Sequence, residues 1–170
     1  MCGFYDKEMR EEGLIISEFN IFECETGKAL VEFGALQICR IKETTDSIII
    51  EELKYLPTGA NWGFELVRIG EQVVSLQNEN LVASELKPKF QGASIEKVRQ
   101  KEFLKSISKR KGIGENWEEE LGKLELLSLI GNRRAWKILK NYEKIKRGQM
   151  DGALAEQWKD AIANVEWIIE

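Results

Sequence analysis

Short apolar runs separated by turn residues fill the first half of the chain, up to about residue 90. Runs of this length that are rich in isoleucine, valine and phenylalanine are typical of β-strands. The pattern predicts six strands, at residues 14–23, 29–41, 47–55, 62–69, 72–76 and 81–86. Because the runs follow one another closely, we expect an antiparallel meander, a small barrel or a sandwich.

Three glycines in this half refine the prediction. Gly27 lies in the polar stretch 25–28 and can supply the positive φ of a hairpin turn. Gly34 interrupts the second apolar run, which indicates a bulge or a bend. Gly70, followed by Glu71, is expected to make a tight turn between the fourth and fifth strands.

After Pro88 the apolar period changes from two to 3.6 residues, which is typical of amphipathic helices. Four helices are predicted, at about 94–109, 116–130, 133–147 and 153–167, with Ser94 and Asn116 as candidate N-caps. Strands followed by helices predict an α+β fold. We expect a β-rich domain over residues 1–90 and a helical domain, or a helical appendage packed on it, over 91–170.

Composition narrows the range of function classes. The 170 residues are 43% hydrophobic and 32% charged, values of a globular protein, and no apolar run is long enough to cross a membrane. The chain has no histidine, which removes His-based triads, His-ligated metals and imidazole acid–base catalysis. Its three cysteines are irregularly spaced and the N-terminus lacks the apolar core of a signal peptide. We therefore expect a cytoplasmic protein, of a cell or an infected host, without metal or cofactor.

Charge is divided unevenly along the chain. Residues 1–86 contain 16 acidic and 7 basic side chains, whereas residues 87–170 contain 13 acidic and 18 basic ones. The basic side chains are concentrated at 87–111 and 133–147. Such a division favours an acidic partner, either a protein surface or nucleic acid, but the basic helices could equally form a solvated face.

The candidate partner-binding or nucleic-acid-binding residues come from these two basic stretches. They are Lys101, Lys105, Lys109, Arg110, Lys111, Arg133, Arg134, Trp136, Lys137 and Lys140. Trp136 lies at helical spacing from several of the cations, which suits a binding hot spot or a base-stacking platform. The alternative is that Trp136 packs on the β half. Asn132 and Lys137 are polar where a helix-turn-helix unit needs apolar residues, so that motif is not met.

The N-terminus carries the one nucleophile that works without histidine. If Met1 is removed, the free amine of Cys2 could serve as the base for its own thiol. The start Met1-Cys2-Gly3 resembles the class II glutamine amidotransferases and the abasic-site-crosslinking domains. The first resemblance implies Cys2 as the nucleophile, and the second implies attack of Cys2 on an open sugar aldehyde.

The remaining features favour binding over catalysis. Adjacent carboxylates, such as Glu51-Glu52 and 118–120, are expected at the surface. Residues 156–161 with Glu166-Trp167 resemble in composition the C-terminal ends of phage tail-fibre assembly chaperones, which implies an assembly role.

We therefore expect a non-enzymatic interaction protein, an adaptor, assembly factor or regulator, that binds an acidic protein through its basic, tryptophan-containing helical half. The first alternative is a sequence-nonspecific nucleic-acid binder, and the second is an enzyme with Cys2 as nucleophile. No membrane partner is expected, and an exposed apolar stripe on a helix could join two copies of the chain.

Overall fold

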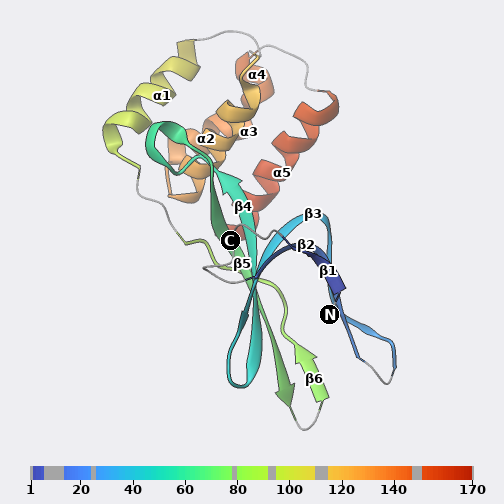
Figure 1. Cartoon of the computed structure of the whole chain (residues 1–170). Coiled ribbons are helices and arrows are strands. Elements are labelled where there is room, and N and C mark those ends of the chain that lie inside the picture. The colour runs from blue at the N-terminus through green and yellow to red at the C-terminus, as the bar shows by residue number, and fades with distance from the viewer. Residues whose placement is uncertain are drawn as a thin grey trace. The chain divides into compact units, whose positions relative to one another are not determined.

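A computed structural model of the chain has an antiparallel sheet in its first half and helices in its second half (Figure 1). The α+β fold class predicted from the sequence is confirmed. The structure describes residues 2–5, 14–23, 26–77, 80–91, 95–109, 115–146 and 151–169. The predicted cap Ser94, the predicted site residues Arg110 and Lys111, and Cys24 lie outside these ranges.

Seven strands form one sheet in the described part of the chain. They are β1 (Cys2–Tyr5), β2 (Leu14–Phe22), β3 (Ala29–Glu43), β4 (Ser47–Leu56), β5 (Glu65–Gln77), β6 (Asn80–Ala83) and β7 (Lys87–Pro88). The first six lie side by side in chain order, and β7 pairs with β5. This is the meander that closely spaced strands predict, because each short turn returns the chain beside the strand it has just left.

One face of the sheet carries the apolar core of the β-rich part. Successive side chains of a strand point to opposite faces, so Cys39 and Ile41 of β3 share a face with their neighbour Ile50 of β4. The stacked rings of Phe19 and Phe33 lie 5.1 Å apart in the same core. Cys39 is fully buried, and burial together with the charge of Glu52 raises the pKa of its thiol to about 12.

Two of the three glycine predictions are confirmed. Gly27 has a φ of +68° in the hairpin between β2 and β3. Beside Gly34 the register between β2 and β3 shifts. Ser17 pairs with Ile38 and Phe19 pairs with Phe33, so a step of two residues on β2 corresponds to a step of five on β3. The predicted turn at Gly70 is wrong, since β5 runs straight through it. Gly70 is buried and pairs with Pro88, and a residue without a side chain suits such a close backbone approach.

The tip of the β4–β5 hairpin differs from the strand predicted at 62–69. Residues Ala60–Trp62 form a 3₁₀ turn, and β5 begins only at Glu65. Asn61 and Trp62 have φ values of 54° and 64°. The alternation of large and small residues from Trp62 onward resembles that of a strand, which is why the pattern predicted one there.

The helices are α1 (Lys97–Lys109), α2 (Trp117–Leu129), α3 (Arg133–Lys140), α4 (Tyr142–Lys146) and α5 (Gly152–Ile169). The helix predicted at 133–147 is divided, because the chain turns at Asn141 between α3 and α4. Helix α2 is buried on nearly all sides from Glu120 to Leu129. Both of its buried carboxylates accept a hydrogen bond. The Tyr142 hydroxyl donates to Glu120 at 2.9 Å, and the Asn164 amide donates to Glu125 at 3.2 Å.

Two asparagines precede helices, but only one acts as a side-chain cap. The Asn132 Oδ1 accepts hydrogen bonds from the backbone N–H groups of Arg134 and Ala135, both at 3.1 Å, whereas Asn116 makes no such bond before α2. We expect Asn132→Ala to lower the free energy of unfolding by about 1 kcal/mol, because helical N–H groups lose their acceptor. Urea denaturation followed by circular dichroism measures the change. Asn116→Ala is the matched control, and an equal loss in both variants would contradict the assignment.

By its internal contacts the chain divides into two compact units. The β unit comprises residues 1–54 and 66–91, and the helical unit comprises 55–65 and 92–170. The tip of the β4–β5 hairpin therefore belongs with the helices, whereas the sequence pattern suggests one boundary near residue 90. Within the helical unit the Trp62 ring lies 5.6 Å from that of Phe103 in α1, and Phe64 lies close to Gly122 in α2.

Candidate partner-binding surface

Helix α1 carries a row of exposed lysines. Its apolar side is buried through Phe103, Leu104 and Ile107. Lysines recur every fourth residue on the exposed side, at Lys97, Lys101, Lys105 and Lys109. Because an α-helix rises 1.5 Å per residue, the row extends over roughly 18 Å.

The N-terminal end of α3 is bonded to α1. The Asn132 side chain donates a 2.9 Å hydrogen bond to the Gln100 side chain, and the Arg134 guanidinium lies 3.4 Å from the Ser108 hydroxyl. Ser108 directly precedes Lys109. The structure thus brings Arg134 of the second basic stretch to the end of the lysine row of the first.

The members of this surface are exposed and lack acidic partners in the described ranges. We call six exposed cations of α1 and α3 the basic surface: Lys97, Lys101, Lys105, Lys109, Arg133 and Arg134. None of the six forms an ion pair with a described residue. Their charge is therefore compensated by solvent and ions alone within the described part of the chain.

The remaining predicted residues of α3 are arranged differently. Lys137 is exposed on the helix. The Lys140 ammonium lies 4.4 Å from the centroid of the Trp136 ring and 2.8 Å from a carboxylate oxygen of Glu166 in α5. Trp136 is only partly exposed, and a cation that is itself ion-paired lies over its ring. Such a ring is a poorer platform for a stacked base than the sequence suggested.

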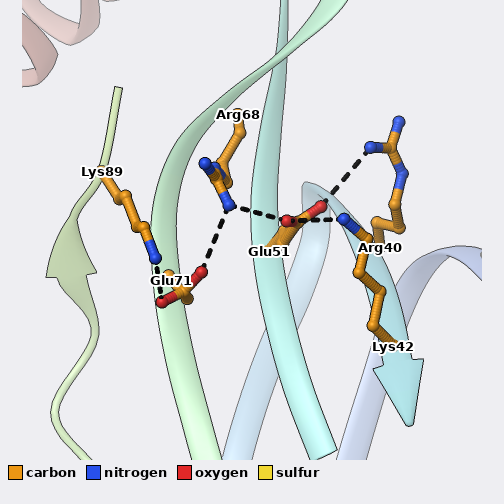
Figure 2. Close-up of polar contacts among 6 residues, drawn as sticks. All are labelled: Arg40, Lys42, Glu51, Arg68, Glu71 and Lys89. Carbon is orange, nitrogen blue, oxygen red and sulfur yellow. Dashed lines mark hydrogen bonds and ion pairs between the residues drawn. The ribbon is translucent and has the colours of Figure 1, made fainter. Parts of the chain in front are cut away.

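The sheet carries a buried ionic cluster that the sequence pattern does not predict. Glu51 of β4 is only 2% exposed, which contradicts the expectation that Glu51-Glu52 lies at the surface. Two cations reach its Oε1, Lys42 Nζ and Arg68 Nη1, both at 2.9 Å (Figure 2). Arg40 Nη1 lies 3.4 Å from Oε2, across the β3–β4 pair.

The ionic cluster continues across the next strand. Arg68 Nη1 also lies 3.3 Å from Glu71 Oε2, and Glu71 Oε1 accepts from the Lys89 ammonium at 2.6 Å (Figure 2). Cations and carboxylates thus alternate from β3 to the residue after β7. Because Arg40 neighbours core residues on both sides in sequence, the cluster lies on the sheet face opposite the apolar core.

The pKa values of the adjacent residues Glu51 and Glu52 are shifted in opposite directions. Burial alone would raise the pKa of Glu51, but the hydrogen bond from Lys42 and the charges of Lys42, Arg68 and Arg40 outweigh it and hold that pKa below its usual value. Burial raises the pKa of Glu52 on the core side, against a hydrogen bond from Gln37 and the charge of Lys54. One sequence signal was available, since Arg40 lies between the apolar residues Cys39 and Ile41, and Glu51 directly follows three isoleucines.

Comparison of the chain with protein-family models, with curated proteins and with solved structures found no match. The resemblances at Met1-Cys2-Gly3 and near the C-terminus stay predictions, and the Cys2 side chain lies outside the described part of the structure. Within the described ranges, no helix has the length and apolar character needed to cross a membrane.

Proposed function

We propose that the chain is a non-enzymatic interaction protein that binds an acidic protein partner through its basic surface. One observation carries the proposal: two hydrogen-bonded contacts hold α1 and α3 together, so that cations from both helices adjoin without ion-pair partners in the described chain. An acidic partner would gain several charge contacts at once. Complementary charge of this kind increases the association rate and selects the partner.

The extent of the surface favours a macromolecule over a small anion. A row of roughly 18 Å on α1 is longer than a single phosphate or carboxylate group needs. Exposed lysines are also flexible, so each contributes little binding free energy alone, and affinity requires several of them to contact the partner at once. A partner with carboxylates repeated along a helix or strand would meet these requirements.

The regular lysine spacing also favours a second candidate, a sequence-nonspecific nucleic-acid binder. Lysines that make no other ion pair are the side chains that contact phosphates without reading bases. The covered ring of Trp136 weighs against base stacking, which is why we place this candidate second. Salt distinguishes the two, because binding through phosphates weakens by orders of magnitude between low and physiological salt.

Charge reversal tests the surface directly. We expect Lys105→Glu/Arg134→Glu to weaken binding of labelled poly-glutamate by about tenfold or more, measured by fluorescence anisotropy at low and physiological salt. The matched control is Lys144→Glu/Lys159→Glu, which changes the net charge equally at exposed positions of α4 and α5. We expect the control to change the affinity by less than threefold.

Labelled single- and double-stranded oligonucleotides complete the experiment. Tighter binding of oligonucleotides with a steep salt dependence would favour the second candidate over the first. If neither poly-glutamate nor oligonucleotides bind at low salt, or if both double variants lose binding equally, the basic surface is not the binding site.

A further inference from the structure

The helical unit also contains a cavity, whose lining residues do not include the cations of the basic surface. Residues of the hairpin tip 55–65, α1 and α2 line this open cavity of about 540 Å³. Its apolar wall is formed by Trp62 and Phe103, and polar side chains converge on it from all three segments. The volume lies within the range of small-molecule sites, which combine apolar walls with a few placed polar groups.

The tip that forms one wall is held in a strained conformation. The backbones of Asn61 and Trp62 both have φ in the left-handed region, which residues other than glycine rarely adopt. The Trp62 ring lies between neighbours of α1 and α2, with the Arg99 guanidinium carbon 4.9 Å and the Lys123 ammonium 5.0 Å from its centroid. Strained residues held by their surroundings in this way cluster at binding sites.

Most charges in the cavity are already paired. Lys123 forms an ion pair of 2.5 Å with Glu119, and buried Glu120 accepts the Tyr142 hydroxyl. Two charges of opposite sign remain, Arg99 and Glu102 of α1. Neither forms an ion pair with the other or with any described residue. The Arg99 guanidinium makes one long contact of 3.5 Å, to the Gly59 carbonyl oxygen.

The spacing of the two charges defines the ligand that would meet both. Residues three apart on a helix have Cβ atoms roughly 5–6 Å apart, so Arg99 and Glu102 can reach one small molecule from the same side. An arginine over an aromatic ring keeps its N–H groups available for a carboxylate, to which it can donate two parallel hydrogen bonds. The Glu102 carboxylate can accept charge-assisted hydrogen bonds from an ammonium group.

We propose that this cavity binds a small zwitterion of the α-amino acid class with an apolar or aromatic side chain. The ligand carboxylate lies on Arg99, its ammonium group on Glu102, and its side chain against Trp62 and Phe103. The site is separate from the proposed partner-binding function and does not depend on it.

The experiment uses the indole N–H signal of Trp62 in a ¹H–¹⁵N spectrum of the whole chain. The five tryptophans give one such signal each, and the signal lost in Trp62→Phe identifies that of Trp62. Titration with L-phenylalanine, L-leucine and L-glutamine should shift this signal saturably for at least one of the apolar amino acids. L-Phenylalaninamide, which lacks the carboxylate, and 3-phenylpropanoate, which lacks the amine, should each bind about tenfold more weakly than L-phenylalanine.

Variants test the two charges separately. Arg99→Gln should weaken L-phenylalanine binding about tenfold or more, and Glu102→Gln should do the same while leaving 3-phenylpropanoate binding unchanged. Lys159→Gln, an exposed charge on α5, is the control, and unchanged signals from the other four indoles show that each variant is folded. The proposal is overturned if none of the three amino acids binds saturably, if the amide binds as tightly as the amino acid, or if the control loses as much affinity as Arg99→Gln.

Discussion

Glu51→Gln should lower the free energy of unfolding by about 3 kcal/mol, one of the two largest losses we expect from a single substitution in this chain. The glutamine amide has the same shape but no charge. It leaves Arg40, Lys42 and Arg68 close together on the sheet without the carboxylate that they share. Arg40 and Arg68 are mostly buried, so water compensates them only in part, and removing one partner of a buried ion pair costs much more than removing an exposed one.

Urea denaturation at neutral pH measures this effect, with Glu32→Gln as the control. Glu32 is an exposed glutamate of β3, and its replacement should change the free energy of unfolding by less than about 0.5 kcal/mol. If Glu51→Gln is as mild as Glu32→Gln, the ionic cluster contributes nothing to stability.

The difference between wild type and Glu51→Gln should also depend on pH. Because the pKa of Glu51 is lowered in the folded state, its contribution to stability is complete above the unfolded-state pKa and is lost as the pH falls through the folded-state pKa. The two proteins should therefore converge in stability at acidic pH. A difference that stays constant down to acidic pH would contradict the lowered pKa.

Leu127→Ala should lower the free energy of unfolding by about 3 to 4 kcal/mol. Leu127 is completely buried in α2, the helix that packs against both α3 and α5. The truncation removes apolar contacts and leaves a cavity that a helix held on several sides cannot close by moving. The helical signal in circular dichroism follows the loss during urea denaturation.

Leu76→Ala provides the comparison for this second prediction. Leu76 lies in β5 and is 64% exposed, so the same chemical change should have an effect of less than about 1 kcal/mol. Equal losses in the two variants would mean that α2 is not the centre of its unit.

Apolar periodicity alone predicted the fold class because strands and helices bury side chains at different intervals. Ile50 of β4 and the leucines of α2 at positions 121, 124 and 127 are buried where the periods of two and 3.6 place them. Gly27 was predictable as well, since its hairpin needs a positive φ that few residues other than glycine adopt. The turn expected at Gly70 failed because glycine also suits a strand that another backbone approaches closely.

Burial of charge could not be read from the chain in the same way. Glu51 is adjacent to Glu52 in sequence, yet its environment is set by Arg40 on β3 and Arg68 on β5, which reach it only after the strands have paired. The 3₁₀ turn at Trp62 depends likewise on contacts with α1, 37 or more residues away in sequence. The exposed cations of the basic surface were predictable, because surface lysines require no partner for their placement.

The hairpin tip makes the helical unit discontinuous in sequence. The chain passes from one unit to the other after residues 54, 65 and 91, so no single cut separates them. A gene fragment that ends at residue 91 would encode the tip without the helices it packs on, and the complementary fragment would lack Trp62 and Phe64. Recombination at the apparent boundary would therefore damage both products, and the two halves of this chain are expected to be inherited, expressed and engineered as one piece.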